Sequence, residues 1–359
     1  MRPALGVLLF SDYSIRQLVE LAQLSEGLGY QSFWYTDVRF ARECYVALTA
    51  VALQTSKIRL GPGVTDPYSR HPAITATTIA TLDEVSGGRA LLGLGTGGTG
   101  FRELGIETKL PVAAMRETVE MVRALLRGGE VTVEGKVVSL HGGRLLFEPP
   151  RRDIPIYFAT HGAQITVLAG RIADGVMIAN TLDPKAFDFY AKKLAEGMAK
   201  DGRAEGSVDL ALRVEACISD NDDAAFEVMR KRVTSRVLSQ YPHWDYLTEL
   251  GIELPRELVE IAERKNPKAA GEAAKLMPRP VVESMVLGGS AERCAEQLAK
   301  ALDPRITSVT VRPHAIAGDN VGSVLRAFAE DVFPRALALR AAMPSAAIVP
   351  APTGAAAAK

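Results

Sequence analysis

Short apolar runs in this sequence are followed by small or polar residues, and the types of these residues suggest a site. In chain order they are Ser11 and Asp12; Thr36 and Asp37; Gly63, Val64 and Thr65; Thr96, Gly97 and Gly98; Thr160, His161 and Gly162; Asn180 and Thr181; Glu215; and Arg312 and His314. Glycines, hydroxyls and single polar groups dominate, and paired acids are scarce. The set favours a flat ring lying against the backbone, with a cofactor carrying the hard chemistry.

Other chemistries lack their usual signatures. The chain has no His-Glu-x-x-His, no Gly-x-Ser-x-Gly and no Gly-Lys-Ser/Thr motif, so metal or serine hydrolysis is not expected. Residues 93–98 match Gly-x-Gly-x-x-Gly, yet the next helical pattern starts only near Val112, whereas a dinucleotide fingerprint opens a helix directly. We interpret this segment as a glycine turn, which would also suit a bound ring.

Composition narrows the class of protein. The 359 residues include 42 Lys+Arg and 42 Asp+Glu, so the formal net charge is +0 and nucleic acid is not an expected partner. Cys44, Cys217 and Cys294 are widely spaced, which suits reduced thiols and predicts neither a disulfide framework nor a metal site. No apolar run is long enough for a membrane span or a signal peptide, so we expect a cytoplasmic protein without a membrane partner.

Two glycine turns stand out. Gly61 and Gly63 interrupt the apolar run 58–64, and glycine weakens a strand unless the backbone must bend or be closely approached. Thr160-His161-Gly162-Ala163 precedes a helical pattern, and backbone N–H groups at a helix start can bind a cofactor phosphate. From the residues alone, an ordinary turn between a strand and a helix is the favoured interpretation of the first segment, and the two interpretations are equal for the second.

The elements that would position these residues alternate between strand and helix. Continuous apolar runs predict buried parallel strands, and apolar residues at helical spacing predict helices between them. The predicted strands are 4–10, 32–35, 58–64, 90–95, 154–159, 175–179, 209–219 and 308–311; the helices are 14–28, 44–53, 73–85, 112–126, 163–172, 184–200, 222–239, 290–302 and 321–332. Eight such units predict a TIM (β/α)8 barrel, with its site at the carboxyl ends of the strands.

Two segments break the alternation. Residues 130–147 show two alternating runs around Glu134-Gly135-Lys136, which predicts a β-hairpin inserted after the fourth helix. Residues 240–286 are rich in proline and predict a helical insertion between the seventh and eighth units. We therefore expect one barrel domain over residues 1–342, and a disordered Ala/Pro-rich tail over residues 343–359.

Several local motifs together resemble a known family. They are Thr36-Asp37 with Arg42, residues 60–72 (LGPGVTDPYSRHP), 81–89 (TLDEVSGGR), 92–95 (LGLG), 104–107 (LGIE) and 168–176 (LAGRIADGV). On these motifs the chain resembles the bacterial-luciferase-like superfamily, and within it the deazaflavin-dependent branch that contains methylenetetrahydromethanopterin reductase. The resemblance covers residues 4–179, about half of the chain, and less securely the last strand.

The resemblance implies a usually dimeric TIM barrel that transfers a hydride between C5 of coenzyme F420, an 8-hydroxy-5-deazaflavin, and an electrophilic carbon of a small organic substrate. That carbon would be an iminium, a carbonyl or an activated alkene. The resemblance also implies a non-prolyl cis peptide between Gly63 and Val64 that supports the ring. The cofactor-binding residues would be Gly63, Val64, Thr65, Thr96, Gly97, Gly98, Thr160, Gly162, Ala163 and Asn180.

Catalytic roles are expected for two residues. We assign Asp37 first and His161 second as the polar groups beside the ring, where an acid would complete protonation. An alternative for Asp37 is a structural role, either capping a helix or pairing with Arg42. No metal ligand is expected.

Two departures from the branch bear on the substrate. The methylene-pterin reductases carry carboxylates at positions that match Leu8 and Gly98 here, so a different substrate is favoured.

Two alternatives for function stay open at this point. One is an FMN-dependent luciferase-like monooxygenase, and the other is a catalytically silent flavin-binding protein.

Overall fold

Eight parallel strands form the centre of the fold in the computed structural model, which describes residues 2–160, 162–179, 181–242, 244, 247–248, 251–264 and 269–343. They are hydrogen-bonded in the order β3-β2-β1-β11-β9-β8-β7-β4. Their bounds are β1 (Ala4–Leu9), β2 (Ser32–Tyr35), β3 (Arg59–Pro62), β4 (Leu92–Leu94), β7 (Ile156–Thr160), β8 (Gly175–Ala179), β9 (Asp209–Ile218) and β11 (Ser308–His314). Parallel bridges from Leu60 to Ala90 and from Thr65 to Leu94 join β3 to β4. The sheet is thereby closed, and the predicted TIM barrel is confirmed.

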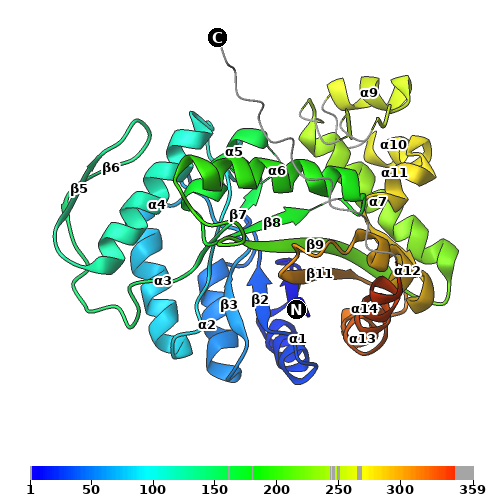
Figure 1. Ribbon diagram of the computed structural model, residues 1–359, viewed down its shortest axis with the longest axis horizontal. Helices are drawn as coiled ribbons and strands as arrows, with labels where there is room; N and C mark the ends of the chain where they lie inside the picture. The colour runs from blue at the N-terminus through cyan, green and yellow to red at the C-terminus, as the bar shows by residue number, and fades with distance from the viewer. Residues whose placement is uncertain are drawn as a thin grey trace, which may run out of the picture.

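Helices connect the strands and surround the barrel (Figure 1). They are α1 (Ile15–Gly27), α2 (Cys44–Gln54), α3 (Pro72–Ser86), α4 (Pro111–Arg127), α5 (Ala163–Ile172), α6 (Pro184–Lys200), α7 (Asp222–Gln240), α12 (Ala291–Ala301), α13 (Val321–Ala327), the π-helix η2 (Phe328–Val332) and α14 (Phe333–Ala342). The predicted helix 321–332 therefore stops too early. Pro334 stands in the first turn of α14, where a proline breaks no helical hydrogen bond.

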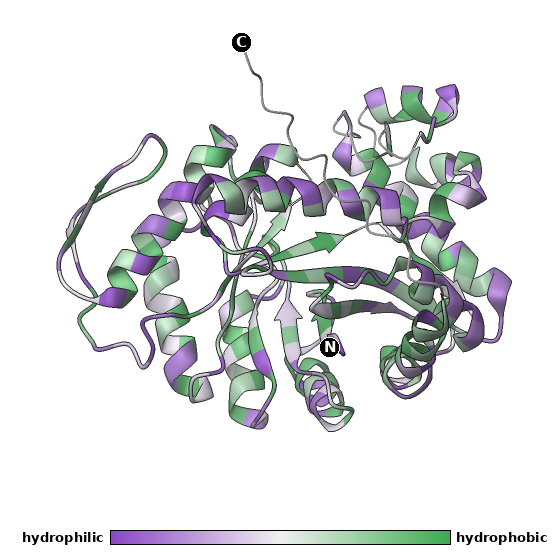
Figure 2. Cartoon of the chain, viewed as in Figure 1, coloured by the Kyte–Doolittle hydropathy of each residue, from purple (hydrophilic) through white to green (hydrophobic). Residues whose placement is uncertain are grey.

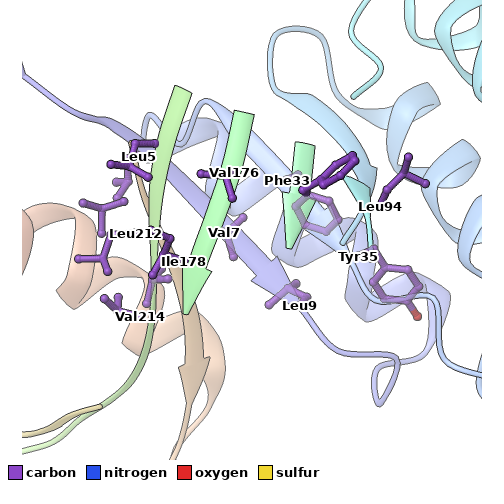
Figure 3. Packing of buried hydrophobic residues seen from close by; sticks show 14 of the residues in the cluster. Leu5, Val7, Leu9, Phe33, Tyr35, Leu94, Val176, Ile178, Leu212 and Val214 are labelled. Atoms are coloured by element: carbon purple, nitrogen blue, oxygen red, sulfur yellow. The ribbon is translucent and has the colours of Figure 1, made fainter. Parts of the chain in front are cut away.

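Alternation along the strands separates two apolar regions. Leu5, Val7 and Leu9 point outward into the main core against the helices (Figure 3), and Leu8 points inward. Figure 2 shows hydrophobic residues along several of the central strands and mixed hydropathy on the surrounding helices. The inward residues form a small cluster that fills the middle of the barrel: Leu8, Trp34, Leu91, Tyr157, Met177 and Ala211. Because this layer is filled, a site must lie beyond it, at the carboxyl ends of the strands.

The first interruption of the alternation is an antiparallel hairpin of β5 (Val131–Glu134) and β6 (Ser139–Gly143). It projects to one side of the barrel next to α4 (Figure 1). The Glu117 carboxylate on α4 accepts hydrogen bonds from the backbone N–H groups of residues 136, 137 and 138 at 2.9, 3.0 and 3.2 Å. Nε2 of His71 also lies 3.0 Å from the carbonyl oxygen of Ser139, so the hairpin is attached at two points.

The second interruption contains α9 (Arg256–Glu263), α10 (Ala270–Leu276) and α11 (Arg279–Glu283), beside α7. It leads into β10 (Leu287–Gly289), which pairs with β9 and was not predicted. The tail over residues 344–359 lies outside the described residues, and its disorder and the domain limit at residue 342 stay predictions. No helix in the described part of the chain is long and apolar enough to cross a membrane.

One strand is longer than its prediction. β11 continues through Arg312, Pro313 and His314, where the sequence interpretation ended it at Val311. Proline cannot donate to a sheet ladder, so Pro313 within a paired strand is unusual. The pairing with β9 nevertheless extends from Ser308 to His314. Arg312 and His314 are consequently strand residues, and the Arg312 side chain is buried instead of lying on a solvated rim.

Candidate active site

The end of β3 is the most constrained part of the barrel mouth. Between the bridges at Leu60 and Thr65, β3 contains one more residue than β4 does between Ala90 and Leu94, so β3 bulges. The peptide bond between Gly63 and Val64, within this bulge, is cis, which is the bond at which the sequence resemblance placed it.

Neighbouring backbone and side-chain atoms leave no room for a Cβ at the glycines of the bulge and of the facing strand. A Cβ at Gly61 would lie 1.8 Å from the carbonyl oxygen of Leu91, and one at Gly63 would lie 2.8 Å from Cβ of Trp34. On the facing strand, a Cβ at Gly95 would lie 2.6 Å from Cγ2 of Val64. Glycine therefore allows β3 and β4 to meet while leaving Gly63 and Val64 half-buried at the mouth.

Asp37, the first predicted catalytic residue, follows β2 and is joined to the end of β3. Its Oδ2 accepts a hydrogen bond of 2.7 Å from the hydroxyl of Thr65. Its Oδ1 lies 3.7 Å from the Arg39 guanidinium, and its side chain is 12% exposed. Arg42 does not pair with Asp37, because its guanidinium donates to the carbonyl oxygens of Ser11 and Asp12 at 3.3 and 3.4 Å. Asp37 is therefore a hydrogen-bonded carboxylate that remains reachable from the mouth.

Arg39 was not singled out from the sequence, yet it connects three loops of the mouth. Its guanidinium donates to the backbone carbonyl of Asp37 and to the buried carboxylate of Asp66 after β3. It also donates to the hydroxyl of Ser69 at 2.5 Å and lies over the ring of Phe101, 5.7 Å from its centroid. Arg39 thus holds the segments after β2, β3 and β4 together.

The glycine turn after β4 lies against this framework. Gly97 has a φ of +69°, and a Cβ there would lie 2.4 Å from the Phe101 ring, so only glycine fits. Gly98 has a φ of +133°, and a Cβ there would have no other atom within 4 Å, so its backbone faces open space. Thr96 is half-buried, and Gly97 and Gly98 are exposed. Gly97 and Gly98 therefore present exposed backbone without side chains at the mouth.

The turn after β7 is the predicted phosphate site. The Thr160 hydroxyl donates to the carbonyl oxygen of Gly162 at 3.1 Å, so it shapes the turn. Gly162 caps α5 without any side-chain hydrogen bond to the helix start, and Ala163 is the first helical residue. A Cβ at Gly162 would have no other described atom within 4 Å, and N–H groups at a helix start of this kind can bind an anion. His161 and Asn180 lie outside the described residues.

A buried charge cluster occupies the opposite side of the mouth. The Glu215 carboxylate, 2% exposed, accepts from Arg232 at 2.5 and 3.0 Å and lies 2.9 Å from Nε2 of His314. Arg213 and Arg312 are each 3.5 Å from the same carboxylate. Burial by itself would raise the pKa of Glu215, but the His314 hydrogen bond and the guanidinium charges hold it well below its usual range. Glu215 is ionised and central to this cluster.

Burial lowers the pKa of basic residues in this cluster. Burial lowers the pKa of the His314 imidazole, and the adjacent Glu215 carboxylate opposes this only in part. Burial likewise lowers the pKa of Arg213 to about 9.

Within the described residues, no group of three or more His, Cys, Asp or Glu side chains is arranged to hold a metal ion. The mouth therefore offers backbone, hydroxyl and guanidinium groups as its binding chemistry.

Comparison with known proteins shows the family to which this chain belongs. A model of the family described as luciferase-like monooxygenase matches residues 5–308. The chain belongs to the luciferase-like family. The match covers seven of the eight barrel strands, beginning one residue into β1, and it ends at Ser308, the first residue of β11.

Individual members of the luciferase-like family point to one branch. A 5,10-methylenetetrahydromethanopterin reductase from Methanolobus tindarius is 33% identical over 314 residues, covering 86% of this chain and 91% of that protein. An F420-dependent glucose-6-phosphate dehydrogenase from Nocardia farcinica is 28% identical, covering 91% of this chain and 96% of that protein. The structure of a coenzyme F420-dependent tetrahydromethanopterin reductase from Methanopyrus kandleri has a TM-score of 0.81 and 29% identity, covering 93% and 99% of the two chains.

Proposed function

We propose that this protein is an F420-dependent oxidoreductase that transfers a hydride between C5 of the deazaflavin and an electrophilic carbon of a small organic substrate. The observation that carries the proposal is the glycine backbone at the mouth, at Gly63 after β3 and at Gly97 and Gly98 after β4. It offers a planar ring a surface without side chains. F420-dependent relatives that cover most of this chain support the identity of the ring.

The chain would hold the cofactor at two places. Gly63, Val64 and the glycine turn after β4 would lie against the ring, and the N–H groups at the start of α5 would bind its phosphate. When bound, F420 supplies a carbon centre that donates or accepts two electrons as a hydride. These protein groups bind and orient the cofactor, and the filled inner layer below them excludes water from that side.

Asp37 is the residue that we propose for proton handling. Its carboxylate can accept or return a proton at Oδ1 or Oδ2 while the Thr65 hydroxyl and Arg39 hold its orientation. Leu8 lies in the apolar inner layer and Gly98 carries no side chain, so neither provides the acid that the pterin reductases place there. We therefore propose a substrate other than a methylene-pterin.

Side-by-side binding of F420 and FMN tests the cofactor. We expect purified protein to bind F420 saturably and FMN at least about 100-fold more weakly. Binding of FMN without F420 would contradict the proposal and would favour an FMN-dependent monooxygenase. Incubation with F420 deuterated at C5 in its reduced form and a panel of carbonyl, imine and activated alkene compounds then tests the chemistry. Deuterium in a product supports hydride transfer, and its absence across the panel favours a silent flavin-binding protein.

A variant at the start of α5 tests the phosphate position. Ala163→Asp adds a negative charge where the first helical turn favours one, so the fold should tolerate it, but that charge would repel a bound phosphate. We expect F420 affinity to fall by about tenfold or more. Ala163→Ser is the matched control, because it adds polarity without charge. Equal F420 affinity in both variants would place the phosphate elsewhere.

We also propose that the protein is a cytoplasmic homodimer. Val46 and Leu53 lie seven residues apart on α2, and both are 66% exposed. Ile74, at the start of the neighbouring α3, is 54% exposed. Apolar residues repeated on one helix face need a covering partner, and a second copy of the chain is the simplest one. The three cysteines are buried free thiols, which suits a reducing compartment.

A further inference from the structure

Arg312 differs from the other cations of the Glu215 cluster. Arg232 forms a bidentate pair with Glu215, at 2.5 and 3.0 Å, and His314 takes a further contact at 2.9 Å. Arg312 reaches the same carboxylate only at 3.5 Å, at an oxygen that Arg232 already contacts. Bidentate pairs are the strong form of this interaction, so Glu215 is committed mainly to Arg232.

Among the residues that the structure describes, the guanidinium of Arg312 meets a carboxylate only at this 3.5 Å distance. Its side chain is 10% exposed, and its plane lies over the ring of Phe10, 4.6 Å from the centroid. Burial lowers the pKa of Arg312 to about 10, with the charges of Arg213 and Arg232 adding to this effect and Glu215 and Asp12 opposing it. A guanidinium has five N–H donors in a fixed fork, and the Glu215 contact involves only one nitrogen of Arg312, so further donors are available to a bound anion.

The direction of Arg312 follows from strand alternation. Val309 and Val311 belong to the outer core, so Arg312 between Val311 and Pro313 points into the barrel. Phe10 follows Leu8 by two residues, and Leu8 belongs to the inner layer, so the Phe10 ring lies on the mouth side of that layer. The donors of Arg312 are therefore held in the mouth, above the apolar filling of the barrel.

The strand order places Arg312 away from the proposed cofactor surfaces. In the closed order β3-β2-β1-β11-β9-β8-β7-β4, β11 stands four positions from β4, which is the opposite side of an eight-stranded barrel. The ring-binding glycines lie after β3 and β4, and the proposed phosphate position follows β7. An anion at Arg312 would face the ring from across the mouth, where a substrate must lie.

We propose that the substrate carries an oxyanion, a carboxylate or a phosphate, that binds the guanidinium of Arg312 at the carboxyl end of β11. This assignment rests on the proposed function, because it takes the cofactor to occupy the β3, β4 and β7 side. The fork of N–H donors matches the two oxygens of such a group, and the Phe10 face holds the guanidinium plane in position. The anion would fix the substrate so that its reacting carbon faces the ring.

Calorimetric titration with inorganic phosphate and with succinate tests this anion site in the purified full-length protein. We expect at least one of the two to bind saturably, with a dissociation constant of about 10 mM or lower. Arg312→Gln should weaken that binding by about tenfold or more, and Arg312→Lys by a smaller factor because it keeps the charge and loses the fork. Glu215 keeps its bidentate bond to Arg232 in both variants, so the fold should persist.

Arg256→Gln is the matched control, because Arg256 is 92% exposed on α9 and pairs with a single glutamate at 3.1 Å. It should bind the anions as the wild type does. Absence of saturable binding in the wild type, or equal binding in the wild type and Arg312→Gln, would overturn the anion site.

F420 titration of the same variants separates the two proposals. Unchanged F420 affinity in Arg312→Gln, together with lost anion binding, supports a substrate site. A parallel loss of F420 affinity would overturn that assignment, because the anion would then belong to the cofactor. Anion binding through Arg312 in a wild type that binds no F420 would overturn the proposed function and leave the anion site supported.

Discussion

The hydroxyl of Thr65 donates a 2.7 Å hydrogen bond to the carboxylate of Asp37, which joins the end of β3 to the end of β2. The Thr65 side chain is buried, whereas the Asp37 carboxylate is reachable from the mouth. A fixed donor on one side and an open lone pair on the other suit a group that exchanges a proton with a bound molecule.

Replacement of Asp37 tests this role. Asp37→Asn keeps the shape and an oxygen for Thr65 but removes proton acceptance, so we expect turnover to fall by about 100-fold or more. F420 affinity and the unfolding midpoint should stay close to those of the wild type. The measurement is the steady-state rate with F420 and the substrate found by deuterium transfer. Turnover at the wild-type level would exclude Asp37 from the chemistry.

Thr65→Val provides the comparison, because it preserves the Asp37 charge and removes only the donor. Loss of one hydrogen bond to a charged group costs about 1.5 kcal/mol, so turnover should fall by about tenfold. A loss as large as that of Asp37→Asn would indicate that orientation of Asp37, not its charge, limits the reaction.

Closure of the barrel depends on glycine at position 61. A Cβ there would overlap the carbonyl oxygen of Leu91, a backbone atom that cannot move without opening the junction of β3 and β4. We expect Gly61→Ala to lower the free energy of unfolding by about 3 kcal/mol or more. Urea denaturation followed by circular dichroism measures this. Gly27→Ala, at the exposed end of α1 with nothing within 4 Å, is the control and should cause no loss.

The Glu215 cluster makes stability depend on pH in one direction. The pKa of His314 is lowered by burial from its ordinary value of 6.5, so the unfolded chain binds this proton first as the pH falls. Stability is therefore complete above about pH 6.5 and decreases below it. The pKa of Glu215 is also lowered, from 4.5, so a second loss begins below that pH as the unfolded carboxylate protonates.

Urea midpoints of the wild type and His314→Gln between pH 7.5 and 5.5 check the first loss. We expect a shallower decline in the variant, because it removes one group that takes up a proton on unfolding. Parallel declines in the two proteins would show that His314 does not contribute.

If α2 forms the dimer interface, a charged residue introduced on α2 should lower the mass of the protein particle in solution. Val46→Asp and Leu53→Asp would place carboxylates in an apolar interface, so both should shift the protein from dimer to monomer in light scattering coupled to size-exclusion chromatography. Leu146→Asp is the control, because Leu146 is 87% exposed beyond the hairpin and should leave the dimer intact. A monomeric wild type, or dimeric α2 variants, would contradict the proposed interface.

Periodicity in the sequence determined most of the element order. The helix Ala163–Ile172, the strand Gly175–Ala179 and the helix Pro184–Lys200 have the bounds that their patterns predicted. Local apolar spacing is sufficient there, because each element buries a face or a stripe that its own residues define. The glycines at the mouth were also recognisable, since glycine inside an apolar run signals a bend or a close approach.

Only the tertiary structure decided which charges meet. Glu215 and His314 are 99 positions apart, and pairing of β9 with β11 brings them into contact. Arg39 joins three loops through contacts that no local pattern encodes. Burial of Arg312 depends on β11 continuing past Val311 to His314, beyond the apolar run that defined the predicted strand. Local spacing specifies elements, but distant pairing and burial specify which side chains share a site, and these follow only from closure of the barrel.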